Sequence, residues 1–138
     1  MLDGISLPSA FDADEAGLWL ASVALQECKV IEELQYVFCN DSYLIDINQE
    51  YLSHDTFTDI ITFPYKTDPI QAEIYISLDR VNENALLYNG GNLMLELYRV
   101  LVHGLLHMCG YDDSSDVDKK NMRNLEDYYV SMRPGDSF

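Results

Sequence analysis

The most informative stretch of this sequence is HGLLHMCGYDD, which occupies residues 103–113. If this stretch is helical, His103 and His107 lie one turn apart and their imidazoles project from the same face. Gly110 can adopt the left-handed backbone conformation that ends a helix and reverses the chain. That reversal would bring Asp113 back towards the two histidines. We therefore expect a long helix that ends beside these three side chains.

Two imidazoles and a carboxylate are a common ligand set for one divalent metal ion, and Zn²⁺ is the ion we expect. Three protein ligands leave one coordination position open for water, as in catalytic zinc sites. The spacing H-x3-H-x5-ligand is that of metzincin-type sites, with Asp113 in the place of the usual third histidine. Asp112 remains an alternative ligand, although the spacing favours Asp113. Because a carboxylate is harder than an imidazole, other divalent ions such as Mn²⁺ or Ni²⁺ should be less excluded.

Hydrophobic periodicity on both sides of this stretch predicts a mixture of helices and short strands. The expected helices cover about residues 12–28, 41–52, 79–89, 92–109 and 115–132. The expected strands cover residues 4–7, 30–39, 58–63 and 72–77, the last two bounded by Pro64 and Pro69. Strands in the first half and helices in the second indicate an α+β fold, with helices packed on a small sheet.

Length and composition are those of one globular domain covering residues 1–138. Of the 138 residues, 48% are hydrophobic and 23% are charged, close to the averages for soluble proteins. No apolar run approaches the roughly 20 residues of a membrane span. Residues 1–28 contain neither Lys nor Arg, and the three cysteines form no CxxC pair. We therefore expect a cytoplasmic protein with reduced thiols, no secretory leader and no membrane contact.

The charge of the chain is strongly acidic. Twenty-four Asp and Glu against eight Lys and Arg give a formal net charge of −16. Such a chain repels nucleic acid at long range, which counts against nonspecific DNA or RNA binding. Lys119, Lys120 and Arg123 are close enough in sequence to group on one helix. The alternative is an ordinary solvated helix of mixed charge, because Glu126 and Asp127 lie nearby.

The stretch that begins at His103 resembles the signature HGxLHxxGYDH of the YbeY family of bacterial rRNA-maturation proteins. The matching positions are His103, Gly104, Leu106, His107, Gly110, Tyr111 and Asp112. Further matches to the family's LNxxYR…T(D/N)VLSFP block and GDIxI(S/C) strand are Asn48, Tyr51, residues 58–64 (TDIITFP) and residues 72–77 (AEIYIS). The resemblance covers roughly residues 44–130 in the expected order and spacing.

This resemblance implies a small mixed four-stranded sheet flanked by helices, with the metal site at the end of the long helix. It implies a metal-dependent, single-strand-specific endoribonuclease that acts in 3′-end maturation of small-subunit rRNA and in ribosome quality control. The implied partners are precursor rRNA, the small ribosomal subunit and its assembly proteins, without DNA or a membrane. One Zn²⁺ per chain, held by His103, His107 and Asp113, would lower the pKa of a bound water from near 16 towards about 7.

Several positions depart from the family pattern. Asp113 replaces its third histidine, and Ala72 and Glu73 replace the Gly and Asp of its GDI strand. Leu52 stands where the family usually has an arginine thought to serve activity. The missing arginine affects the expected catalysis more than the expected fold.

Two other residues are candidates to hold a substrate phosphate in place of that arginine. Arg99 lies one helical turn before His103, and His54 lies in the segment before the third expected strand. Either side chain could donate a hydrogen bond to a phosphate oxygen. The alternatives are a surface ion pair of Arg99 with Glu96 and an exposed loop position for His54.

Three other functions remain open at the level of sequence. A ribosome-assembly factor could bind a partner protein without cleaving RNA. A metallopeptidase would need a general base, but Gly104 occupies the position where HExxH peptidases have their glutamate. A purely structural zinc would hold the fold together, so that metal removal would unfold the chain.

Overall fold

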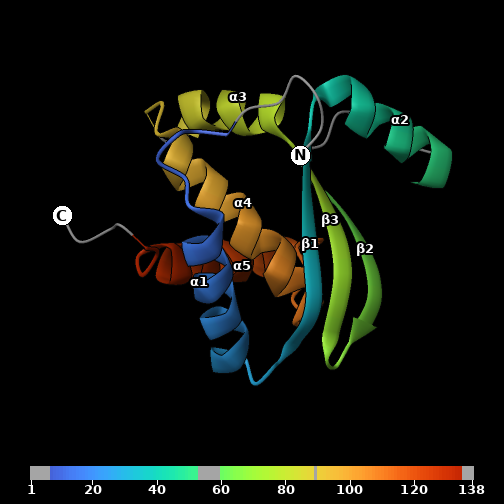
Figure 1. Ribbon diagram of the computed structural model, residues 1–138, viewed down its shortest axis with the longest axis vertical. Coiled ribbons are helices and arrows are strands. Elements are labelled where there is room, and N and C mark those ends of the chain that lie inside the picture. Colours follow the sequence, from blue (N-terminus) through green and yellow to red (C-terminus); the bar gives the residue numbers. More distant parts are fainter. Residues whose placement is uncertain (1–6, 53–59, 89, 135–138) are drawn as a thin grey trace.

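The computed structural model describes residues 7–52, 60–88 and 90–134 (Figure 1). Each expected helix is present, with ends within two residues of the prediction. The elements in chain order are α1 (Ala13–Gln26), β1 (Ile31–Cys39), α2 (Asp41–Leu52), β2 (Ile60–Thr67), β3 (Ile70–Ser77), α3 (Leu78–Tyr88), α4 (Leu93–Met108) and α5 (Asp116–Val130).

The described strands form one mixed sheet in the order β1-β3-β2. The central strand β3 pairs in parallel with β1 and antiparallel with β2. Ala72 of β3 lies opposite Leu34 of β1 on one side and Pro64 of β2 on the other. The α+β class and the mixed sheet are therefore confirmed.

The expectation of four strands is wrong for the part of the chain that the structure describes, where the sheet has three. The fourth was expected at residues 4–7, of which only Leu7 is described, and it lies outside any strand. Pro8 accepts a hydrogen bond from the N–H of Phe11 at 3.0 Å, which forms a turn into α1. Leu7 packs against the hydrophobic core instead of pairing with the sheet.

Strand β2 extends beyond the proline at which we expected it to end. The prediction stopped at Phe63, but the strand continues through Pro64 to Thr67. A proline is tolerated here because β2 is an edge strand, where a missing N–H need not leave a neighbouring strand unpaired. The register shift between Pro64 and Lys66 shows the local irregularity that accompanies it.

Helix α4 forms the centre of the main core, between the sheet and the other helices (Figure 1). Eleven of its 16 residues are buried, so the helix is covered on nearly all sides. Helices α1, α3 and α5 all pack against it. Trp19 of α1 donates from Nε1 to the carbonyl of Tyr129 in α5 at 3.2 Å, which ties two of these helices together. None of the described helices is both long and apolar enough to cross a membrane.

Gly104 allows α4 to approach the sheet closely. A Cβ atom at this position would lie 2.9 Å from Cδ1 of Ile74 and 3.0 Å from Cδ1 of Ile60. Both distances are too short for carbon atoms in van der Waals contact. A larger side chain at position 104 therefore conflicts with the packing that places α4 under β2 and β3.

Helix α2 packs on a second, smaller cluster beside the sheet. Its Leu44 and Ile47 are buried together with Cys39 of β1 and Ile61 of β2. The main core and this cluster thus use alternate residues of the same strands, as expected where side chains point to opposite faces.

Candidate metal centre

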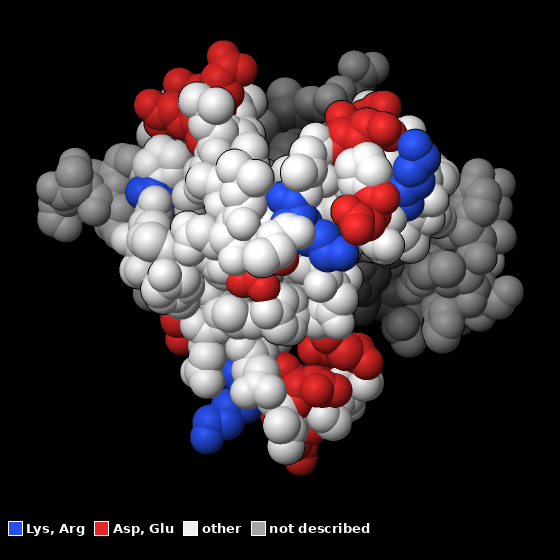
Figure 2. Space-filling model, turned by 90° about the horizontal axis from the view of Figure 1, so that it is seen from below, with Lys and Arg blue, Asp and Glu red and all other residues white. Residues whose placement is uncertain are grey.

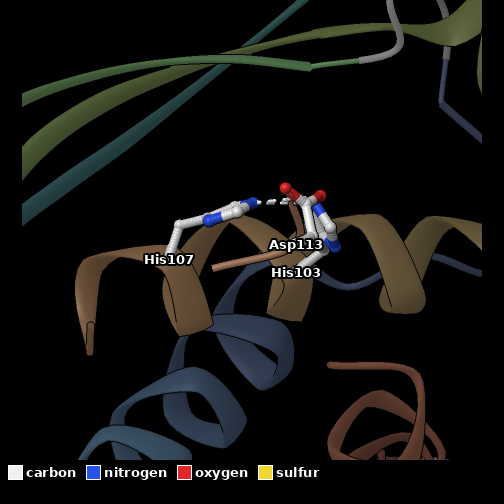
Figure 3. A group of neighbouring side chains, drawn as sticks. All are labelled: His103, His107 and Asp113. Atoms are coloured by element: carbon white, nitrogen blue, oxygen red, sulfur yellow. Dashed lines mark hydrogen bonds and ion pairs between the residues drawn. The ribbon is translucent and has the colours of Figure 1, made fainter. Parts of the chain in front are cut away.

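The two histidines and the aspartate identified from the sequence lie together in the structure (Figure 3). His103 and His107 project from the same face of α4, with their Nε2 atoms 3.0 Å apart. The Oδ2 atom of Asp113 lies 3.4 Å from Nε2 of His103 and 3.6 Å from Nε2 of His107. All three side chains are partly exposed, so an ion can reach the cluster from solvent.

A glycine turn brings Asp113 to the histidines. Gly110 has a φ of 102°, a backbone conformation that residues with a side chain rarely adopt. The N–H of Tyr111 donates to the carbonyl of Leu106 at 3.1 Å and closes the turn. Helix α4 therefore ends at Met108 and the chain reverses, as Gly110 predicted.

The neighbouring Asp112 is engaged within its own loop. Its carboxylate accepts hydrogen bonds from the N–H of Asp113 at 2.8 Å and from the hydroxyl of Ser114 at 2.9 Å. These hydrogen bonds lower the pKa of Asp112 below its usual value. The structure thus brings Asp113, and not Asp112, to the histidines.

The Nδ1 atoms of both histidines face hydrogen-bond acceptors. Nδ1 of His103 lies 2.6 Å from Oε2 of Glu126, and Nδ1 of His107 lies 2.9 Å from the carbonyl oxygen of Tyr111. Because a carboxylate and a carbonyl only accept, each Nδ1 carries the proton of its neutral ring. Each Nε2 then presents a lone pair, the tautomer in which histidine binds a metal ion through this atom.

The three converging atoms fit one divalent ion. Two Nε2 lone pairs and a carboxylate oxygen are all acceptors, so without a cation or an added proton they repel one another. Tetrahedral ligands at about 2.0–2.1 Å from an ion are separated by about 3.4 Å. The observed separations of 3.0, 3.4 and 3.6 Å are close to that value. The cluster can therefore hold a metal ion.

A network of ion pairs between α4 and α5 contacts His103 on the side away from Asp113 and His107. It was not predicted from the sequence. Glu126 is only 6% exposed, although it was interpreted as part of a solvated helix. Its second oxygen accepts from Nη1 of Arg99 at 3.1 Å, and Arg99 also pairs with Asp127 at 2.5 Å. The spacing of residues in α5 could have indicated that Glu126 is buried, because Glu126 lies on the same side of the helix as the apolar residues Met122 and Tyr129.

In this network the guanidinium of Arg99, a candidate ligand for a substrate phosphate, is paired with two carboxylates. The expected surface pair with Glu96 is not the ion pair that forms, because Arg99 is 9% exposed and bridges α4 to α5. Burial lowers the pKa of its guanidinium, but hydrogen bonds to Asp127 and Glu126 outweigh burial and raise it overall. A guanidinium held by two carboxylates is poorly placed to bind a substrate phosphate. The other candidate, His54, lies outside the described residues.

The loop that carries Asp113 is anchored to two helices through Glu27. This residue at the end of α1 accepts a hydrogen bond from the hydroxyl of Tyr111 at 2.6 Å and another from Tyr129 of α5. The hydrogen bond to Glu27, with burial as a smaller cause, raises the pKa of Tyr111 to about 12. Because the carbonyl of Tyr111 orients His107, this anchor also restrains the histidine.

Comparison with known proteins agrees with this geometry. The sequence model of the family described as Endoribonuclease YbeY matches residues 13–132. A protein from Flavobacterium psychrophilum named Endoribonuclease YbeY is 51% identical over 115 residues, which cover 83% of this chain and 81% of that protein. A Porphyromonas gingivalis protein of the same name is 41% identical over 135 residues, covering 94% and 85%.

A solved structure shares the fold. The solution structure of TM1509 from Thermotoga maritima superposes with a TM-score of 0.63 at 28% sequence identity, covering 86% of this chain and 78% of that one. The family match spans the metal-binding cluster, its supporting glutamate and the sheet above them. The chain therefore belongs to the YbeY family of endoribonucleases.

Proposed function

We propose that this chain is a metal-dependent endoribonuclease that cleaves single-stranded RNA in the maturation of small-subunit rRNA. The observation that carries the proposal is the convergence of two Nε2 lone pairs and one carboxylate oxygen. Hydrogen bonds from both Nδ1 atoms hold the rings in the required tautomer. The relatives named Endoribonuclease YbeY support RNA as the substrate.

We further propose that His103, His107 and Asp113 hold one Zn²⁺. A bound divalent ion supplies Lewis acidity to a phosphoryl oxygen and makes a bound water more acidic. Asp113 adds a negative charge that a third histidine would not, so it offsets part of the charge of the ion. The protein's part is to fix the three donors and to leave the solvent side open for water and substrate.

The buried glutamate has a separate role in this proposal. Glu126 accepts the Nδ1 proton of His103 and so keeps Nε2 directed at the ion. Its pairing with Arg99 compensates the charge that it brings into the core. With an ion bound, Glu126, His103 and the metal would form a carboxylate–histidine–metal triad, in which the carboxylate raises the basicity of the histidine.

We place this activity in the cytoplasm, on precursor rRNA and the assembling small ribosomal subunit. Cys28, Cys39 and Cys109 are all free thiols, which supports a reducing compartment. The net charge of −16 makes a general affinity for nucleic acid unfavourable. Recognition of RNA therefore depends on local features near the metal centre and on docking to the particle.

Elemental analysis and an RNA cleavage assay test the proposal together. Wild-type protein should carry about one zinc per chain, and Asp113→Ala should lose most of it. Zinc-loaded wild type should cleave single-stranded rRNA fragments, whereas metal-free protein should not. Equal cleavage with and without metal would remove the ion from the mechanism.

A complementation experiment separates cleavage from binding. In a strain lacking the corresponding gene, His103→Ala should fail to restore rRNA processing. Full rescue by His103→Ala would instead show that binding to a partner is the function. A peptidase is not supported, because the glutamate base of HExxH enzymes would need space at Gly104 that Ile60 and Ile74 occupy.

A further inference from the structure

A pocket opens beside the metal centre, on the side of α5. It has a volume of about 300 Å³ and reaches from His103 and Asp113 to Asn84 of α3. Lys119 and Arg123 of α5 also line it. These two residues are four positions apart on the helix and so present their side chains on one face. A ligand in this pocket can therefore touch both cations and the metal centre at once.

These two cations form no ion pair within the described residues, unlike Lys66, Arg80 and Arg99. Lys66 pairs with Glu32, and Arg80 pairs with Asp41 and Glu83. By contrast, the side chains of Lys119 and Arg123 form no ion pair or hydrogen bond with any residue in the ranges that the structure describes. Both are exposed.

The acidic residues that line the same pocket are already engaged. Glu126 is paired with Arg99 and hydrogen-bonded to His103, while Asp113 belongs to the metal centre. Glu96 is 7% exposed, so it presents little charge to solvent. With a divalent ion bound, the pocket has an excess of positive charge although the whole chain has a net charge of −16.

Such an excess contrasts with the composition of the chain, in which Asp and Glu outnumber Lys and Arg by 24 to 8. In Figure 2, which shows one face, the blue Lys and Arg side chains are small and separated, and patches of red Asp and Glu lie between them. A polyanion approaching a surface of this kind is repelled except where cations are local and unpaired. The pocket beside the metal centre meets that condition.

We propose that Lys119 and Arg123 bind backbone phosphates of single-stranded RNA and hold the strand across the metal centre. Arginine can bind two phosphate oxygens at once, and lysine supplies a compact positive charge. A cationic groove that follows the backbone is how proteins hold single strands without reading sequence. This inference rests on the proposed function, because it assigns a subsite for the same substrate.

The helix itself offers a matched control. Lys120 is exposed and adjacent to Lys119, but it does not line the pocket. Lys119→Gln and Lys120→Gln therefore remove the same charge from the same helix, and only Lys119→Gln removes it from the pocket. Arg123→Gln and the double variant Lys119→Gln/Arg123→Gln complete the set. Circular dichroism should be identical for all four, since each position is exposed.

The primary measurement is binding of a fluorescein-labelled single-stranded RNA to zinc-loaded protein, followed by stopped-flow fluorescence anisotropy immediately after mixing, before cleavage, over a range of salt concentrations. Each lost phosphate contact should lower the slope of log affinity against log salt by about 0.7 for a single strand. Lys119→Gln and Arg123→Gln should each weaken binding about two- to fivefold at low salt, the range measured for exposed ion pairs. Lys120→Gln should behave as wild type.

Kinetics of the zinc-loaded protein provide the second readout. Because the two cations lie beside the donor cluster and do not belong to it, their loss should raise KM more than it lowers kcat. Equal slopes and affinities for Lys119→Gln, Arg123→Gln and Lys120→Gln would overturn the subsite while leaving the nuclease intact. Absence of RNA binding and cleavage by zinc-loaded wild type would instead overturn the proposed function, and this inference with it.

Discussion

Replacing Glu126 by glutamine tests how the protein prepares its metal centre. The change preserves volume but removes a charge that two groups share, His103 at 2.6 Å and Arg99 at 3.1 Å. Glutamine can turn its oxygen towards one of these donors, but its NH₂ group then faces the other. Loss of a partner that orients a metal-binding histidine lowers metal affinity about 10- to 100-fold, which corresponds to about 1.4–2.8 kcal/mol. We expect a loss within this range for Glu126→Gln.

The same change should also destabilise the metal-free fold. Removing one partner of a buried ion pair costs about 3–5 kcal/mol when the other charge is left alone. Arg99 is not left alone here, because Asp127 still lies 2.5 Å away. We therefore expect a smaller loss in the free energy of unfolding, about 1–3 kcal/mol.

The control is Asp127→Asn, which removes the other partner of Arg99 without touching His103. Zinc affinity is measured by competition with a chromophoric chelator, and stability by urea unfolding of the metal-free proteins. Asp127→Asn should lose stability and keep the wild-type zinc affinity, whereas Glu126→Gln should lose both. Wild-type zinc affinity in Glu126→Gln would refute the role that we assign to this glutamate.

Three further predictions concern packing, pH and thiol reactivity. Overpacking by Gly104→Ala costs about 1–3 kcal/mol, and the helix preference of Ala over Gly offsets about 0.5–1 kcal/mol of this cost. Gly17→Ala, in the open part of α1, has the helix gain alone and should raise the free energy of unfolding by about 0.5–1 kcal/mol. Urea unfolding of both variants checks this, and an equal gain in stability for Gly104→Ala would contradict the close contact with the sheet. The hydrogen bond from Tyr111 to a carboxylate raises the pKa of its phenol from 10.0 to about 12. Its contribution to stability is therefore complete below pH 10 and is lost as pH rises to about 12. Stability measured across this range should fall less steeply in Tyr111→Phe than in wild type, and parallel profiles would refute this. Burial raises the pKa of Cys109 to about 11, so the exposed Cys28 should react with a thiol reagent before the partly buried Cys109. Peptide mapping after brief alkylation checks this, and equal labelling of the two thiols would contradict it.

Local pattern predicted the elements well because local interactions dominate helix formation and strand alternation. The long helix was expected at residues 92–109 and is observed at Leu93–Met108. Its end was predictable because Gly110 can adopt a positive φ at little cost. The prediction failed where sheet position mattered, since Pro64 ends a central strand but not an edge strand such as β2.

The cluster of His103, His107 and Asp113 was also predictable, since it depends on helical spacing and one turn. The residues that support it were not. Whether Glu126 faces solvent or α4 depends on how two helices separated by a reversing loop pack together. The spacing of residues in α5 indicates that Glu126 lies on the apolar side of the helix, but it does not indicate which residues of α4 it contacts.

The sequence by itself therefore determined the class of fold, the long helix and the three donors of the candidate metal centre. Each of these follows from the conformational preferences of a short stretch of chain, and neighbouring residues decide those preferences. Only the tertiary structure decided which charges are buried and which are available. It paired Arg99 with Glu126 and left Lys119 and Arg123 facing the pocket. The physical reason is that the cost of burying a charge depends on the partner supplied by a distant segment, and that partner is known only when the helices have packed.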